Sequence, residues 1–240
     1  MIQFKNLNKY FDKFHVLKNI NLELNEGNII ALIGPNACGK TTLIKNILGM
    51  VVPNSGEIEF MNQPIQKDWK YRNHIGYMPQ IGRYPENMTV GQVLEMIEDL
   101  RDEKPEQIDR DLYKSYQLYD ILNKRMGTLS GGTRQKVSAH LAFLFSPKVL
   151  ILDEPTAGLD PLSTLILKEK ILKERDKGKL ILITSHILSE LDNIVNQVIY
   201  MEEGKIIFDK SLEKLKSDTQ KTNLSEAIAH IMSNQASTNN

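Results

Sequence analysis

Residues 28–41 read NIIALIGPNACGKT, an apolar run followed by a loop that a glycine opens and a Gly-Lys-Thr triplet closes. The next residues, 42–49, read TLIKNILG and carry apolar side chains at helical spacing. A strand, the loop pattern G-x-x-x-x-G-K-[ST] and a helix, in that order, form a phosphate-binding motif in its required context. Successive backbone N–H groups and the positive end of the helix dipole can surround a phosphate there. The stretch therefore predicts a phosphate-binding loop at the end of a buried strand.

Side chains and backbone groups of this loop are candidates for nucleotide contact. Lys40 is expected to reach the β and γ phosphates, and the hydroxyl of Thr41 to bind Mg²⁺. Cys38 needs no redox role, because its position asks only for a small side chain. The candidate contacts run through the loop into the helix: Gly34, Pro35, Asn36, Ala37, Cys38, Gly39, Lys40, Thr41 and Thr42.

A second motif supplies the carboxylates that nucleotide hydrolysis needs. Residues 149–155 read VLILDEP, which predicts a buried strand ending in Asp153 and Glu154. Asp153, at the strand tip, can hold Mg²⁺ through water opposite Thr41, whereas Glu154 can orient or deprotonate an attacking water. Together with the phosphate loop, this motif predicts a nucleotide-hydrolysis site.

The composition argues against several other classes of protein. The 240 residues include 30 basic and 30 acidic side chains, so the formal net charge is zero, and 41% are hydrophobic. A mainly disordered chain is usually poor in apolar residues and strongly charged to one sign. Bulk positive charge for binding nucleic acid is missing, so we expect no nucleic-acid partner. The single cysteine excludes an intrachain disulfide, and no run approaches the roughly 20 apolar residues of a membrane-spanning helix.

Short apolar runs alternate with helical patterns along the chain. The expected strands are Ile2–Leu7, Asn21–Leu24, Ile29–Ile33, Glu57–Phe60, Ile75–Met78, Val149–Leu152, Leu180–Thr184, Val198–Glu202 and Lys205–Phe208. The expected helices are Lys40–Leu48, Val90–Leu100, Glu106–Tyr116, Gly131–Leu144, Leu162–Lys177, Ile187–Val195 and Asn223–Met232. The continuous apolar runs at 29–33, 149–152 and 180–184 indicate strands covered on both faces in a mostly parallel sheet.

Other segments indicate how this sheet is elaborated. The first strands alternate polar and apolar residues, which suggests an antiparallel edge. Residues 86–146 contain no good strand and predict a helical subdomain inserted in the α/β core. The charged stretch 98–111 is expected to be a solvated connection between helices, and residues 234–240 are expected to fray.

One motif makes the resemblance to a known family specific: Leu129-Ser130-Gly131-Gly132-Thr133-Arg134-Gln135. It resembles the signature of the ABC (ATP-binding cassette) ATPases. The order of the motifs is similar to that family as well: phosphate loop, Gln80 in YMPQ, the signature, LILDEP, Asp160 in AGLD and His186 in ITSH. Ser130 is a good N-cap before an apolar-periodic helix, so the signature offers a second helix N-terminus to an anion.

The resemblance covers residues 1–232 and implies an α/β fold. This fold is a P-loop NTPase (RecA-like) parallel-sheet core with an N-terminal antiparallel β edge and an inserted helical subdomain. The ABC ATPase domain would span 1–232, with the helical subdomain at about 86–146 and a flexible tail at 233–240. The implied activity is ATP hydrolysis coupled to transmembrane transport, with ATP and Mg²⁺ as cofactors.

The resemblance also assigns roles outside the phosphate loop. Gln80 would complete the shell of Mg²⁺ and water, and His186 would contact the γ-phosphate and hold Glu154 in place. Phe11 would stack on adenine, with Tyr10 as the adjacent alternative; such stacking contributes on the order of 1–3 kcal/mol. The implied catalytic residues are Lys40, Glu154 and His186. The implied Mg²⁺ ligands are Thr41, Gln80 and Asp153. Nucleotide contacts beyond the loop would come from Phe11, Gln80, Ser130, Gly131 and Gly132.

Two positions depart from the family pattern. Ala37 replaces the usual glycine of the phosphate loop, and a left-handed backbone there would cost alanine roughly 1–2 kcal/mol. Thr133 stands where glutamine is commoner in the signature, and we expect this change to be tolerated. The set Lys40, Asp153, Glu154 and His186 is complete, so we predict an active site.

The resemblance implies partners too. A second ABC ATPase subunit, most simply an identical one, would pair head-to-tail so that each signature meets ATP bound to the other chain, with Asp160 at the interface. An integral membrane permease would dock on the surface Ile81–Val90 and hold the protein at the cytoplasmic face of the cell membrane. The sequence YMPQIGRYPENMT, residues 77–89, is similar to that of cassettes associated with nitrous oxide reductase maturation (copper-site assembly).

Two alternatives stay open at this point. One is a soluble ABC ATPase of DNA repair, chromosome structure or translation; such proteins carry a long coiled-coil insertion or two fused cassettes, and this chain has neither. The other is a nucleotide switch that binds without hydrolysing, against which the intact Glu154 argues.

Overall fold

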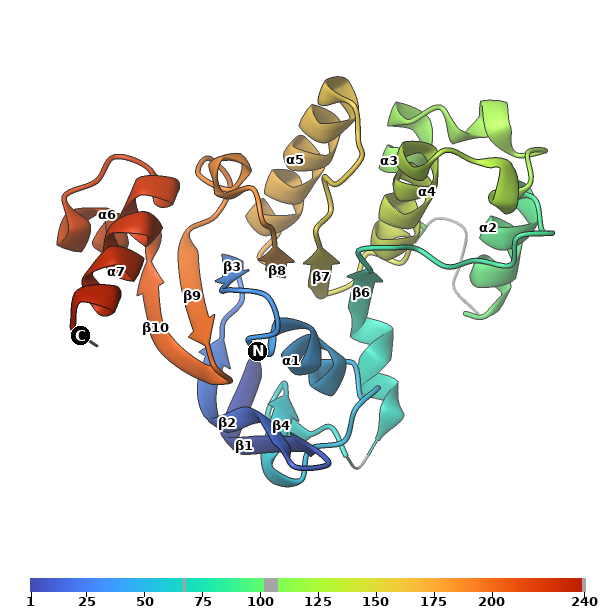
Figure 1. Ribbon diagram of the computed structural model, residues 1–240. Helices are drawn as coiled ribbons and strands as arrows, with labels where there is room; N and C mark the ends of the chain where they lie inside the picture. The colour runs from blue at the N-terminus through green and yellow to red at the C-terminus, as the bar shows by residue number, and fades with distance from the viewer. Residues whose placement is uncertain (67, 102–107, 239–240) are drawn as a thin grey trace. The chain divides into compact units, whose positions relative to one another are not determined.

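The computed structural model describes residues 1–66, 68–101 and 108–238 (Figure 1). The chain divides into two compact units, the first comprising residues 1–71 and 182–240 and the second residues 72–181. Within the described residues, no helix has both the length and the apolar character to cross a membrane.

The first unit contains an antiparallel sheet made by the N-terminal strands. Strands β1 (Ile2–Phe11), β2 (Phe14–Leu24), β4 (Ser55–Phe60) and β5 (Gln63–Pro64) follow the order β2-β1-β4-β5. The predicted antiparallel pairing is confirmed, but these strands form a sheet of their own. They also extend well beyond Ile2–Leu7 and Asn21–Leu24. Register shifts between Phe4 and Tyr10 interrupt the alternation of side chains, so the sequence pattern stopped short of the real hairpin.

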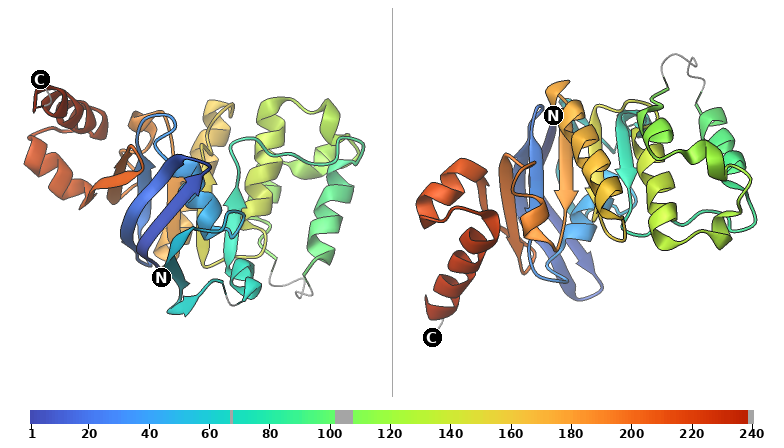
Figure 2. Two further views of the ribbon diagram at one scale, coloured as in Figure 1. Left: turned by 60° about the horizontal axis from the view of Figure 1, so that its bottom comes forward. Right: turned by 90° about the horizontal axis from the view of Figure 1, so that it is seen from above.

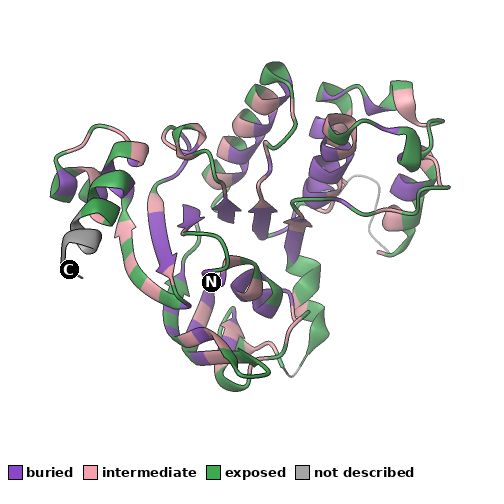
Figure 3. Ribbon diagram, in the orientation of Figure 1, coloured by how far each residue is buried: buried purple, intermediate pink, exposed green. Residues whose placement is uncertain are grey.

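The second sheet of this unit has the parallel core. Strands β10 (Lys205–Ser211), β9 (Gln197–Glu202), β3 (Ile29–Ile33) and β8 (Leu180–Thr184) follow one another in that order, β8 crossing the boundary of the units. β3 and β9 are parallel, and β10 adds an antiparallel strand beside β9. Every residue of β3 and β8 is buried, as the continuous apolar runs predicted (Figure 3). The helix α1 (Lys40–Ile47) buries Leu43, Ile44 and Ile47.

Two C-terminal helices, α6 (Leu212–Thr219) and α7 (Leu224–Thr238), lie against each other (Figure 2). Leu224, Ala227 and Ile228 are buried on the expected apolar face of α7. α7 continues to Thr238, into the residues that we expected to fray. α6 was not predicted, although Ser211 caps it by accepting a hydrogen bond from the Lys214 N–H at 3.2 Å.

The helix expected at Ile187–Val195 is a wrong prediction. The structure has a short 3-10 helix, η5 (Leu188–Glu190), followed by turns. Two side chains there bond to backbone instead of continuing a helix. Ser185 accepts a hydrogen bond from the Ile187 N–H at 3.0 Å, and Asp192 accepts from the N–H of Leu224. Ser and Asp compete with helical hydrogen bonds in this way.

The second unit combines parallel strands with helices. β6 (Ile75–Met78) pairs in parallel with β7 (Val149–Asp153), in register from Ile75 opposite Val149. The helices are α2 (Val90–Asp99), α3 (Asp111–Ser115), α4 (Gly131–Phe143) and α5 (Pro161–Asp176), with 3-10 turns η3 (Leu118–Ile121) and η4 (Met126–Thr128); η1 (Trp69–His74) spans the boundary. The described part of 86–146 contains helices and one isolated β-bridge, Thr89 with Arg125. Residues 102–107, which include much of the charged stretch and the start expected for α3, lie outside the described residues.

A buried ion-pair cluster lies on α5. The side chain of Lys170 is 3% exposed and lies 2.5 Å from Asp109 and 3.0 Å from Glu174. The carboxylate of Glu174 is fully buried and also pairs with Lys177 at 2.7 Å and with Lys179. Burial alone would raise the pKa of Glu174, but its pairs with Lys177, Lys179 and Lys170 outweigh burial and lower that pKa to about 2. The ionised carboxylate is therefore a stabilising part of the fold.

We expect Glu174→Gln to lower the free energy of unfolding by about 3 kcal/mol at pH 7, because it breaks a buried ionic cluster. A folded-state pKa below the unfolded value stabilises at high pH, and this stabilisation is lost between about pH 4.5 and 2. Urea unfolding from pH 7 to pH 3 should show the gap between wild type and variant shrinking. Asp218→Asn, which breaks the surface pair with Lys210, is the control and should change stability little. A gap that stays constant with pH would contradict the assignment.

Candidate functional site

The phosphate loop, residues 34–39, joins β3 to α1 in the first unit, as the motif predicted. Gly39 is the N-cap of α1 with a left-handed backbone (φ 113°). The first turn of α1 holds no acidic residue, so the positive end of the helix dipole faces no carboxylate of its own turn. Such a helix start suits an anion such as phosphate.

Lys40 lies back over the loop. Its ammonium donates hydrogen bonds to the carbonyl oxygens of Gly34, at 2.7 Å, and Pro35, at 3.0 Å, and lies 3.8 Å from the sulfur of the buried Cys38. This places a positive charge inside the curve of the loop. Thr41, on the first turn of α1, is exposed.

Backbone hydrogen bonds of Gly204, which we call the Gly204 brace, hold the loop, and the sequence did not predict them. The Gly204 N–H, in the turn between β9 and β10, donates to the carbonyl of Cys38 at 3.0 Å, and its own carbonyl accepts from the Lys18 N–H at 2.8 Å. A Cβ on Gly34 would lie 2.1 Å from the carbonyl oxygen of Met201, so only glycine fits there. In the sequence, Glu203-Gly204 after a predicted strand indicates a turn, but nothing connects that turn to the phosphate loop.

Ala37 takes the left-handed conformation that the sequence analysis considered, with φ 63°. Its side chain therefore carries the conformational cost that a glycine would avoid.

The two aromatic side chains at the end of β1 are similarly exposed, Tyr10 at 41% and Phe11 at 45%. The ring of Tyr10 stacks on His15, with centroids 3.9 Å apart and planes 10° from parallel, so one of its faces is already covered. Phe11 is 45% exposed, and the ammonium of Lys9 lies 5.0 Å from its centroid. Phe11 also pairs directly with Phe14, which is 79% exposed. Each ring thus has a partner over one face, and stacking of a base on Phe11 stays a prediction. His186 lies in the same unit, exposed, two residues after the end of β8.

The second unit holds the signature. Ser130 caps α4, accepting from the Thr133 N–H at 3.2 Å, as predicted. Its hydroxyl also lies 2.8 Å from the hydroxyl of Thr133, so the unusual threonine is a hydrogen-bond partner of the cap. A Cβ on Gly132 would meet the Gly158 carbonyl oxygen at 2.4 Å, which explains the glycine. Asp160 caps α5 and pairs with Lys136 at 2.9 Å.

The carboxylates stand at the end of β7 beside the signature helix. Asp153 is the last residue of the strand and Glu154 follows it, both half-buried. Glu154 has a left-handed backbone, φ 51°, a strained conformation for a residue with a side chain. Its carbonyl accepts from the Gln135 side chain at 3.3 Å and from the Ala157 N–H at 3.2 Å. The sequence motifs did not predict this contact of Gln135 with Glu154.

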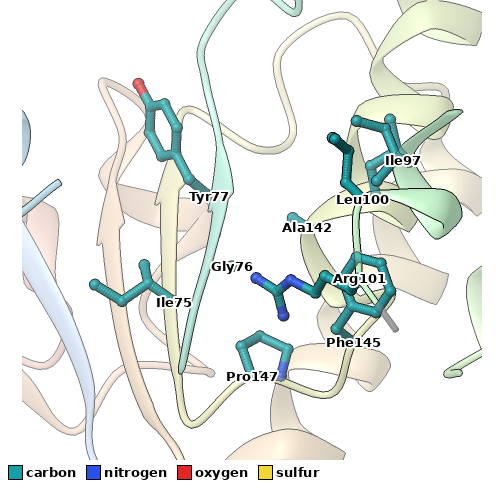
Figure 4. Close-up of a pocket in the computed structure, with 10 residues that line it drawn as sticks. Ile75, Gly76, Tyr77, Ile97, Leu100, Arg101, Ala142, Phe145 and Pro147 are labelled. Carbon is teal, nitrogen blue, oxygen red and sulfur yellow. The ribbon is translucent and has the colours of Figure 1, made fainter. Parts of the chain in front are cut away.

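Gln80 is exposed and directly precedes a segment that lines a pocket of about 420 Å³. This pocket is lined by Ile81, Gly82, Arg83, Tyr84, Glu86, Met126 and Arg134. A separate pocket of about 210 Å³ lies between β6 and the ends of α2 and α4, where Arg101 stacks over Phe145 at 4.4 Å (Figure 4). None of the residues predicted for the site lines that second pocket.

The left-handed Ala37 predicts the sign of a stability change. We expect Ala37→Gly to raise the free energy of unfolding by about 0.5–1 kcal/mol, since relief of strain exceeds the added entropy of the unfolded chain. Ala229→Gly, at an exposed position in the helix α7, is the matched control and should lower it by about 1 kcal/mol. Urea unfolding measures both; an Ala37→Gly protein less stable than wild type would refute the strain.

Comparisons with known proteins identify relatives of this chain. The family model for ABC transporters matches residues 17–157. The chain is 31% identical over 223 residues to the uncharacterized ABC transporter ATP-binding protein YxlF of Bacillus subtilis, covering 92% of this chain and 74% of that protein. It is 32% identical over 215 residues to the lantibiotic transport ATP-binding protein SrtF of Streptococcus pyogenes, covering 89% and 92%.

A solved structure of the ATP-binding subunit of an ABC transporter superposes with a TM-score of 0.90 at 26% identity, covering 97% of this chain and 99% of that one. The fold is that of the ABC cassette, a P-loop NTPase, as predicted. The chain belongs to the ABC transporter family as one of its ATP-binding proteins, an ABC ATPase.

Proposed function

We propose that this protein binds and hydrolyses ATP as the motor subunit of an ABC transporter and drives a separate membrane permease. The phosphate loop carries the proposal: a left-handed Gly39 starts α1, and the Lys40 ammonium lies within the loop. Family membership supplies the reaction, and the loop supplies a place for its phosphates.

Different residues are proposed to bind different parts of ATP. Backbone N–H groups of residues 34–39 and the N-terminus of α1 surround the phosphates, and Lys40 moves from the loop carbonyls to the β and γ phosphates. Thr42, one residue after Thr41, adds a hydroxyl on the first turn. Phe11 supplies an exposed ring face for adenine.

The donor set fits Mg²⁺. We assign Thr41, Gln80 and Asp153 as its ligands, because hydroxyl, amide and carboxylate oxygens are the donors that this hard cation prefers. When bound, Mg²⁺ neutralises charge on the β and γ phosphates.

Glu154 is proposed as the group that orients or deprotonates the attacking water, with His186 contacting the γ-phosphate and holding the carboxylate. The left-handed backbone of Glu154 supports this role, because backbone strain concentrates at functional sites and two hydrogen bonds to the Glu154 carbonyl hold this conformation.

A second copy of the chain is proposed to complete the site. Ser130, Gly131 and Gly132 begin α4 with no acidic residue in its first turn, so this helix also offers its positive end to an anion. In a head-to-tail dimer each signature meets the γ-phosphate on the other subunit, and two ATP molecules lie at the interface.

The permease is proposed to dock on the surface 81–90. Ile81 is 65% exposed beside the pocket that this segment lines, an arrangement suited to an apolar side chain from a partner. The subunit then works at the cytoplasmic face of the cell membrane, held there through the permease. The relative SrtF carries the name of a transport ATP-binding protein.

We propose a narrower role in nitrous oxide reductase maturation from the sequence YMPQIGRYPENMT, residues 77–89, alone. Deletion of the gene should then leave that enzyme without its copper site, assayed by copper content; full copper loading would reject the subtype and leave the ATPase role intact.

A soluble ABC ATPase, or a nucleotide switch uncoupled from transport, is the competing function. We expect Glu154→Gln to reduce turnover about 100-fold or more while ATP still binds, because the loop is unchanged and the water loses its base. The variant should accumulate an ATP-bound dimer, measured by size-exclusion chromatography with and without ATP. Glu169→Gln, on the exposed face of α5, is the matched control. Unchanged hydrolysis in Glu154→Gln would remove the assigned base, and a switch would show no hydrolysis to lose.

Docking on a permease predicts a surface-specific loss of partner. We expect Ile81→Asp to reduce recovery of the membrane subunit from detergent extracts, since a charge would be buried in the contact. Val52→Asp, at a residue 71% exposed in the first unit, should leave recovery unchanged. Recovery of the wild-type protein from the soluble fraction alone, without a membrane partner, would contradict the coupling.

A further inference from the structure

The segment between β8 and β9 carries His186 at its start and is irregular over most of its length. Turn hydrogen bonds run along it: the Ile187 carbonyl accepts from the Glu190 N–H at 3.1 Å, and the Leu191 carbonyl accepts from Ile194 and Val195 at 3.0 Å. Ser185 adds its bond to the Ile187 N–H. These bonds join the histidine end of the segment to its middle, so a displacement of the middle is transmitted to the residues beside His186.

Asp192, in the middle of this segment, is tied to both C-terminal helices. Both of its carboxylate oxygens accept from the Leu224 N–H at the start of α7, at 2.9 and 3.0 Å. The same carboxylate pairs with Lys216 of α6 at 2.9 Å and is 14% exposed. A carboxylate at a helix N-terminus is favoured by the helix dipole, so three interactions converge on one group.

Apolar contacts reinforce this attachment. Leu191 and Ile194 of the segment are buried, as are Leu224, Ala227 and Ile228 of α7, and α7 packs against η5. The far end of the segment is attached as well, since the Asn196 carbonyl accepts from the Leu212 N–H at the start of α6, at 2.9 Å. The C-terminal helices therefore hold the segment at its middle and at its end.

We propose that Asp192 is a positioning residue for His186: by fixing the segment 187–195 to the N-terminus of α7, it sets where the imidazole stands for ATP hydrolysis. The inference rests on the proposed role of His186 at the γ-phosphate. It gives the C-terminal helices a part in turnover, because anything that lifts α7 from the segment would release the histidine.

The test compares ATPase kinetics of the full chain carrying Asp192→Ala with those carrying Asp218→Ala. Asp218 pairs with Lys210 at 2.5 Å and ties α6 to β10, away from the segment, so it controls for a general loosening of the C-terminal helices. We expect Asp192→Ala to lower kcat roughly three- to ten-fold with KM for ATP nearly unchanged, because the phosphate loop is untouched. Asp218→Ala should leave both constants near wild type.

A double variant separates positioning from a structural role. In a His186→Ala background, Asp192→Ala should cause no further loss of kcat, because residues that act as a unit are not additive. An equal further loss, or an unchanged kcat in the single variant while His186→Ala is impaired, would overturn the inference and leave the proposed function standing. An unimpaired His186→Ala protein would overturn both roles.

Should Asp192→Ala fail to fold, Asp192→Asn serves, since it keeps one acceptor for the Leu224 N–H and removes the charge facing Lys216. Hydrogen exchange of the amides of residues 187–195 should be faster in this variant than in wild type, with a smaller fall in kcat. Exchange and kcat both equal to wild type would overturn the inference.

Discussion

One backbone constraint shapes the first unit: the chain must leave β3 as an extended strand and enter α1 as a helix through residues 34–39. Gly34 passes the Met201 carbonyl so closely that no Cβ fits, and Ala37 and Gly39 both take the left-handed conformation. The Gly204 N–H donates a hydrogen bond to the carbonyl of Cys38 and so holds the loop from the turn between β9 and β10. These backbone positions place the loop carbonyls that accept hydrogen bonds from Lys40 directly before the start of α1, an arrangement that suits phosphate binding.

In the second unit, the corresponding features are the start of α4 and the end of β7. α4 starts at a serine cap with no acidic residue in its first turn, whereas the N-terminus of α5 is already occupied by the Asp160 carboxylate. Gly132 approaches Gly158 too closely for any side chain, and Gln135 holds the carbonyl of Glu154. The hydrogen bond from Gln135 thus joins the backbone of Glu154, at the end of β7, to the helix that starts at the signature.

The sequence predicted the parts of this protein that are encoded locally. β3, β6 and β8 have the predicted bounds; the continuous apolar runs of β3 and β8 predict buried strands, and the Ser130 cap follows from its motif. The long β1–β2 hairpin was underestimated, since its register shifts break the alternation. The helix expected at Ile187–Val195 failed because Asp192 bonds to α7, a partner 32 positions away in the chain. The Gly204 brace and the Gln135 contact were missed for the same reason: each depends on tertiary neighbours.

Every role proposed for this protein depends on binding of ATP by the loop around Lys40. Calorimetric titration with MgATP tests it most directly, with Lys45→Ala on the exposed side of α1 as control. We expect saturable binding to wild type and to Lys45→Ala. In Lys40→Ala we expect a loss of affinity of at least about tenfold, since charge-assisted hydrogen bonds to phosphate are removed. Equal affinity of wild type and Lys40→Ala for MgATP would contradict ATP binding by this loop.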